Sequence, residues 1–251
     1  MKRLAMMLIC VLIMITVTAS ADPIPLLDDY TQDYILQYDE SNPDAGHYEY
    51  IYHYPHVDET APGAAPINKY YEDKDSDSQN FSMLINGDYY RDSGISVKTE
   101  ITYTITCNND DYFSVLFEIR DSADGNESVS YVGNVFSREE GKADSTYTLP
   151  QLLKILSYTE DDEWLQERQT AKAETLVRKM IWEQIQENTA GIEFYDDFDE
   201  VQLEENYNPE EDFYLDEKGD PVFFLQPGMA ADESYGLLTF PIPLEDILDE
   251  L

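Results

Sequence analysis

Histidine and carboxylate side chains in one short segment are the first candidates for chemistry. His47, Glu49 and His53 share one side of an alternating stretch that ends at His56, so a zinc site is one interpretation. Residues two apart on a strand lie about 7 Å apart, which separates His47 from His53 by roughly 20 Å. A single zinc ion binds ligand atoms only about 2 Å away. We therefore expect no metal site and no cofactor.

A calcium loop is the second candidate. Asp73, Asp75 and Asp77 have the spacing that opens an EF-hand loop, but Ser78 and Leu84 occupy the positions that need Gly and a bidentate Glu. We interpret this segment as a solvated acidic turn. Weak calcium association by the acidic loops stays open as an alternative.

The sequence gives no support to an enzyme. A Ser or Cys nucleophile needs a His base, and all three histidines lie between His47 and His56, with no Gly-x-Ser-x-Gly elbow anywhere. Glycoside hydrolysis needs a pair of carboxylates, but with 53 acidic residues any chosen pair is uninformative. We expect a protein that is not an enzyme.

Charge restricts the class of partner. The chain has 15 Lys and Arg against 53 Asp and Glu, a formal net charge of −38. Such a field repels nucleic acid and anionic lipid, and favours a cationic partner, a cation or simple solubility. Cys107 is the only cysteine after the N-terminal apolar run, so we expect no internal disulfide.

The N-terminus has the pattern of an export signal. Lys2-Arg3 precede an apolar run from Leu4 to Val17, and Ala19-Ser20-Ala21 provides a cleavage site. We expect residues 1–21 to be removed as a signal peptide, and the rest to be secreted or to face outward from the cell envelope. The alternative is an uncleaved anchor, which would hold the protein at the membrane.

The elements that must position any site follow in order. Residues 22–45 have no steady period and are predicted to be a linker or weakly ordered arm, with a short helix over 30–38 as the alternative. His47 to His56 alternates, which predicts a surface strand of tyrosine and histidine. Its tyrosines could stack on carbohydrate.

We predict an α+β fold, with an antiparallel sheet meander packed on one long helix, followed by a C-terminal hairpin and tail. Alternating residues predict strands at 95–107, 112–120 and 128–137, joined by short polar turns. A long helix is predicted from Asp162 to about Asn188, with an apolar stripe that begins at Trp164 and Leu165. The domain should span 46–251, with a subdivision near 146 between a strand-rich half and a helix-plus-hairpin half.

The C-terminal segment carries a family resemblance. Phe213–Leu215 and Pro221–Leu225 flank a turn containing Gly219, which predicts a hairpin; Leu237–Pro243 should be extended and Leu244–Leu251 helical. With Val135-Phe136, Gly141-Lys142 and Leu149–Leu153 upstream, this order resembles the extracellular domain of RsiV-type anti-sigma factors. That family is a domain of unknown function in most occurrences, and is also found appended to peptidoglycan deacetylases.

The resemblance covers roughly Tyr54 to Leu251 and implies a bacterial, envelope-exposed protein. Some members of the family bind lysozyme. Their Tyr-Glu-Ile-Ala-Pro-Tyr loop is replaced here by Pro227–Tyr235, and the Asp-His-His metal set of the deacetylases is missing. The resemblance therefore implies a fold more directly than a ligand.

Two loops that combine aromatic and acidic residues are the candidates for binding a partner. Their candidate residues are Phe194, Tyr195, Phe198, Tyr207, Met229, Asp232, Glu233 and Tyr235. We expect a protein-binding module that recognises a cationic extracellular protein such as lysozyme, because lysozymes are typically basic. The alternatives are a calcium-dependent structural or adhesive envelope module, and a peptidoglycan or carbohydrate binder.

Overall fold

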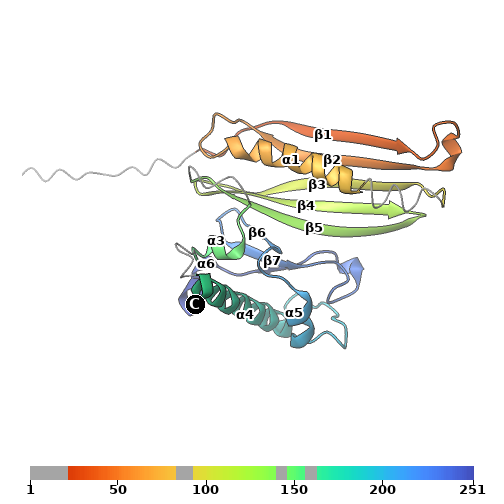
Figure 1. Cartoon of the computed structure of the whole chain (residues 1–251). Helices are drawn as coiled ribbons and strands as arrows, with labels where there is room; N and C mark the ends of the chain where they lie inside the picture. The colour runs from red at the N-terminus through yellow and green to blue at the C-terminus, as the bar shows by residue number, and fades with distance from the viewer. Residues whose placement is uncertain (1–21, 83–92, 140–145, 156–162) are drawn as a thin grey trace, which may run out of the picture.

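The computed structural model describes residues 22–82, 93–139, 146–155 and 163–251. It contains a five-stranded and a three-stranded sheet, with helices on each (Figure 1). The larger sheet consists of β1 (Leu26–Gln37), β2 (His47–Val57), β3 (Val97–Asn108), β4 (Tyr112–Ala123) and β5 (Asn126–Ser137). The smaller sheet consists of β6 (Phe213–Leu215), β7 (Pro221–Leu225) and β8 (Leu238–Pro241). The helices are α1 (Ala65–Ser82), α3 (Leu149–Leu152), α4 (Glu163–Glu187), α5 (Glu200–Asn206) and α6 (Leu244–Glu250), with short 3₁₀ turns at η1 (Pro43–Ala45) and η4 (Glu233–Tyr235).

The predicted α+β class is confirmed, and so is the antiparallel meander. The strands of the larger sheet follow the order β1-β2-β3-β4-β5, and β3, β4 and β5 pair antiparallel through short turns. β2 and β3 pair in parallel, with Tyr48 opposite Val97 and Tyr52 opposite Ile101. A parallel pair needs a crossover between its strands, and α1 lies within that crossover.

α1 packs on the larger sheet where the sequence analysis placed an acidic turn, so that prediction was wrong. Ile67 and Tyr71 are fully buried, because they lie four residues apart on one face of the helix. The buried Asn68 side chain accepts a hydrogen bond from Val57 N at 2.9 Å and donates one to Val57 O at 3.0 Å. The narrow apolar face of α1 and the side-chain amide of Asn68 therefore attach this acidic helix to the larger sheet.

Residues 26–37 form a strand, so the prediction of a linker or short helix for this part of 22–45 was wrong. β1 pairs antiparallel with β2, which places Tyr34 opposite Tyr50 and Leu36 opposite Tyr48. β1 is an edge strand whose six apolar residues do not alternate strictly with polar ones, and its partners in β2 lie 10 to 31 residues away along the chain. Its own pattern therefore gave a weak signal.

β2 has the predicted alternation, but the prediction that its tyrosines lie at the surface was wrong. Tyr48, Tyr50, Tyr52 and Tyr54 are all buried, in a cluster with Tyr71 of α1 and phenylalanines of β4 and β5. Their aromatic bodies fill the space between the sheet and α1. They are not available to stack on a carbohydrate.

The long helix is confirmed as α4, and its core contacts lie with the smaller sheet. Ala173, Val177 and Ile181 join the buried cluster formed by β6, β7, β8 and α6, to which Cys107 and Val135 of the larger sheet also contribute. The predicted start of the stripe was wrong, since Trp164 is 61% exposed and Leu165 is 40% exposed. The hairpin β6–β7, the extended β8 and the helical tail α6 follow the prediction.

The two sheets meet along β5. Gly133 lies so close to β6 that a Cβ atom there would be 1.8 Å from Phe213 O. The Gln226 side chain accepts a hydrogen bond from Tyr131 N at 2.9 Å and donates one to Tyr131 O at 2.8 Å. A glycine and one amide thus fix the smaller sheet against the larger. Over the described ranges, no helix has the length and apolarity required to cross a bilayer.

Candidate partner-binding surface

The two predicted loops lie side by side in the structure. Phe194 and Ala231 form an isolated antiparallel bridge. Next to it, Tyr195 N donates to Ala230 O at 2.9 Å, and Glu193 N donates to the Tyr235 hydroxyl at 3.3 Å. Residues 193–199 and 229–235 therefore form one surface, which we call the loop surface.

Local backbone chemistry fixes the second loop. Gly228 has φ +79°, a conformation that favours glycine, and it turns the chain after β7. Asp232 Oδ1 accepts a hydrogen bond from Ser234 N at 3.0 Å and caps the short turn Glu233–Tyr235. Hydrogen bonds from Ser234 hold the pKa of Asp232 below its ordinary value. Asp232 is therefore charged and held in place.

The first loop is fixed in a similar way. Asp199 Oδ1 accepts a hydrogen bond from Gln202 N at 2.9 Å and caps the start of α5. Tyr195 and Tyr235 are 41% and 43% exposed, so each presents about half of a rigid aromatic side chain to solvent. Rigid, half-exposed tyrosines are the type of residue enriched in protein-binding surfaces.

The loop surface is strongly negative. It contains four carboxylates in 193–199 and two in 229–235, and no Lys or Arg in either segment. The six carboxylates are Glu193, Asp196, Asp197, Asp199, Asp232 and Glu233, and all six are exposed. Such an arrangement attracts a cationic surface and speeds its approach.

Phe198 and Met229 line a shallow cavity at the edge of the loop surface. The cavity has a volume of about 460 Å³, and its other lining residues are Gln202, Asn206, Pro227 and Gly228. Phe198 is half-buried, with its ring centroid 6.3 Å from that of Trp182 on α4. The cavity has room for an apolar side chain of a partner, next to the carboxylates of the loop surface.

Tyr207 does not belong to this surface, so its prediction as a partner-binding residue was wrong. It is 2% exposed, and its hydroxyl donates to Asp212 O at 3.1 Å. Burial raises the pKa of Tyr207 well above its ordinary value. The side chain belongs to the buried core cluster, together with Leu203 of α5 and Phe213 of β6, so it is not available to a partner.

The histidines of β2 have hydroxyl neighbours. His53 Nδ1 lies 2.8 Å from Thr31 Oγ1, and His47 Nδ1 lies 3.3 Å from Ser96 Oγ. Among the residues that the structure describes, no group of three or more His, Cys, Asp and Glu is arranged to hold a metal ion.

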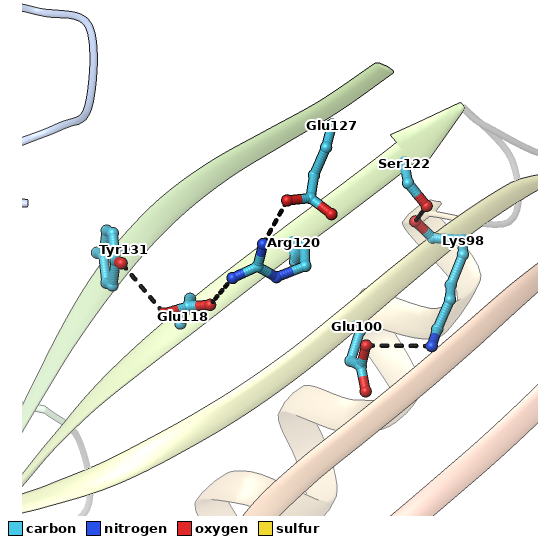
Figure 2. Close-up of polar contacts among 7 residues, drawn as sticks. All are labelled: Lys98, Glu100, Glu118, Arg120, Ser122, Glu127 and Tyr131. Atoms are coloured by element: carbon cyan, nitrogen blue, oxygen red, sulfur yellow. Dashed lines mark hydrogen bonds and ion pairs between the residues drawn. The ribbon is translucent and has the colours of Figure 1, made fainter. Parts of the chain in front are cut away.

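The open face of the larger sheet carries basic residues that are already paired with acids (Figure 2). Arg120 forms ion pairs with Glu118, at 2.6 Å, and with Glu127. The Tyr131 hydroxyl donates to Glu118 at 3.1 Å, and Lys98 pairs with Glu100 at 3.1 Å. Because these cations are neutralised by their neighbours, this face offers little attraction to an anion.

A cavity of about 680 Å³ contains residues that the sequence analysis did not identify. Tyr112, Arg138, Tyr147 and Lys154 line it, together with acidic residues from the ends of β4 and β5. Arg138 is 6% exposed, and its guanidinium donates to Asp22 O at 3.1 Å, Pro62 O at 3.4 Å and Asn109 O. The guanidinium thus connects three segments that are far apart in the sequence. No motif links these segments, so only tertiary structure reveals the cavity.

Comparisons with known proteins give only distant similarities. No protein-family model and no curated protein matches the chain. Several solved structures are similar to it, among them the following two. A crystal structure of a member of the DUF3298 family from Bacteroides fragilis has 11% identity and a TM-score of 0.45, and covers 90% of this chain and 93% of that chain. A DUF3298 family protein from Pseudomonas aeruginosa has 12% identity and a TM-score of 0.48, and covers 91% of this chain and 94% of that chain. These structural neighbours are thus members of a family named as a domain of unknown function.

Proposed function

We propose that this protein is a non-enzymatic binding module that acts outside the cell and recognises a cationic protein, such as a lysozyme, through the loop surface. The observation that carries the proposal is the backbone pairing of two aromatic and acidic loops from distant parts of the chain. That pairing presents Tyr195 and Tyr235 among six carboxylates, and neither loop contributes a basic residue.

Two further points support this proposal. The formal charge of −38 steers a basic protein toward the module, and the rigid tyrosines supply contact area at low entropic cost. The resemblance of residues 213–251 to the extracellular domain of RsiV-type anti-sigma factors adds support, because some members of that family bind lysozyme. The export pattern of residues 1–21 supports an extracellular location.

The test is titration of the full chain with a cationic lysozyme over a salt series. A specific complex should survive salt that screens exposed charges, because buried tyrosine contacts are insensitive to screening. Tyr195→Ala should weaken the complex about tenfold or more, as for an aromatic anchor. A complex that disappears completely at about 0.15 M salt would indicate only nonspecific attraction.

A charge-matched pair of variants tests the location. Asp196→Asn with Asp197→Asn removes two charges from the loop surface, while Glu40→Gln with Asp44→Asn removes two exposed charges near η1. Both double variants have the same net charge, so a nonspecific attraction should weaken equally in both. We expect a clear loss of affinity, about fivefold or more, only for the loop-surface pair. Equal losses would refute the assignment of this surface.

A further inference from the structure

The two edges of the five-stranded sheet differ. At the β5 edge, the backbone groups of Tyr131 are bonded to Gln226, and Val135 O accepts a hydrogen bond from Tyr147 N at 2.6 Å. At the other edge, β1 pairs only with β2 among the strands that the structure describes. Figure 1 shows β1 as the outermost strand, on the side of the sheet away from α4. Within the described residues, one edge is therefore covered and the other is open.

The open edge is long and regular. β1 has a register irregularity between Leu26 and Asp29, and from Tyr30 to Gln37 it follows β2 without interruption. About half of the residues in such a strand direct their N–H and C=O groups away from the paired neighbour. The segment 30–37 contains neither Pro nor Lys, which commonly protect exposed edges from another strand. An extended chain could pair along its whole length.

The side chains of β1 indicate what kind of strand would fit. Ile35 is 56% exposed and Tyr30 is 46% exposed, so the edge offers apolar contacts. Asp33 is exposed, and Glu49 of β2 lies opposite Ile35. The strand 26–37 contains three Asp and no basic residue. Basic side chains that alternate with apolar ones would match this edge in both charge and polarity.

A second copy of the chain fits the edge less well. Pairing β1 with β1 would bring together two acidic strands from proteins that each carry a formal charge of −38. Repulsion between like charges opposes that association. The charge of the edge therefore favours a partner of opposite sign.

We infer that the outer edge of β1 binds an extended, basic polypeptide segment as a sixth strand of the sheet. Main-chain hydrogen bonds from 30–37 supply affinity. On one face of the added strand, Asp33 and the nearby Glu49 select basic side chains, and on the other face the exposed Tyr30 selects apolar ones. This site is separate from the loop surface and does not depend on the function proposed above.

The test uses the full chain and synthetic ten-residue peptides that alternate Val and Lys. The plain peptide should bind, whereas a peptide N-methylated at every second backbone nitrogen should bind at least about tenfold more weakly, because it lacks donors for the edge. A peptide with Glu in place of Lys should not bind. Equal binding of the plain and N-methylated peptides would overturn the inference, since charge alone would then explain it.

Two variants with the same charge change locate the site. Ile35→Lys adds a positive charge at the edge, and Leu248→Lys adds one on α6, where the leucine is 49% exposed. The edge variant should bind the peptide at least about tenfold more weakly, while the α6 variant stays within about twofold of the parent. Equal effects would place the peptide elsewhere. A dimer of the parent chain in sedimentation that Ile35→Lys dissociates would assign the edge to a second copy and overturn the inference.

Discussion

Tyr71→Phe should stabilise the protein, although it removes a polar group from the core. Tyr71 is completely buried, and its hydroxyl has no hydrogen-bond partner among the described residues. Its ring contacts Tyr54, Tyr70, Phe117 and Phe136 at centroid distances of 6.0, 5.4, 5.5 and 5.6 Å. A Phe ring can keep all four contacts. The variant therefore removes only the hydroxyl.

The size of the effect follows from desolvation. A buried donor without a partner costs about 1–3 kcal/mol, so its removal should raise the free energy of unfolding by about 1 kcal/mol or more. In a chain of this length, each kcal/mol shifts Tm by about 2–4 °C. Urea denaturation should show a higher midpoint with an unchanged slope. A scan of thermal unfolding gives an independent value.

Tyr207→Phe is the matched control. Tyr207 is also buried, but its hydroxyl donates to Asp212 O at 3.1 Å, so this variant loses a hydrogen bond. The free energy of unfolding should fall by about 0.5–1.5 kcal/mol. The two substitutions have the same chemistry and opposite expected signs. A clear loss of stability in Tyr71→Phe would show that its hydroxyl is satisfied in solution, and would refute the reasoning.

Three other substitutions have definite expected outcomes. Burial raises the pKa of Asp212 from 3.8 to about 6. Between pH 3.8 and about pH 6 the native state therefore keeps a proton that the unfolded chain has released, so the free energy of unfolding should fall as pH rises through this window. Asp212→Asn should flatten that fall and raise Tm at pH 7; an unchanged pH profile would contradict this. Gly133→Ala should destabilise the protein by roughly 1–3 kcal/mol or more, measured by urea denaturation, because its Cβ would overlap Phe213 O. Gln226→Leu removes both the acceptor of Tyr131 N and the donor to Tyr131 O, so hydrogen exchange at the Tyr131 amide should accelerate; exchange at the parent rate would contradict this.

Local patterns in the sequence were sufficient for much of the fold. Strict alternation predicted β3, β4 and β5, and the spacing of turn residues predicted the hairpin β6–β7. β1 and α1 were missed because their stability comes from partners. The apolar residues of β1 do not alternate strictly with polar ones. α1 has a narrow apolar face together with Asn68, whose side chain forms hydrogen bonds with the backbone of Val57. Periodicity cannot report a hydrogen bond to a distant residue.

The candidate surface was predictable only in part. The mixture of aromatic and acidic residues drew attention to both loops, but nothing in their sequences indicates that Tyr195 N would bond to Ala230 O. Tyr207 resembles Tyr195 in its local sequence, since both lie among acidic residues. What separates them is that Tyr207 is buried in the core cluster and donates a hydrogen bond to Asp212 O, whereas Tyr195 is exposed. Burial is a tertiary property, so composition could not distinguish a core tyrosine from a surface one.

The parallel pairing of β2 with β3 has a consequence for the order of folding. Tyr52 and its partner Ile101 are 101 − 52 = 49 residues apart, whereas β3 and β4 are joined by the three residues 109–111. Closing a long chain segment costs more entropy than closing a short turn, and distant pairings form slowly. The meander should therefore assemble early and act as a template. The N-terminal hairpin would then add to its free side late, and during that interval β3 is itself an unprotected edge at which chains at high concentration can exchange their N-terminal hairpins.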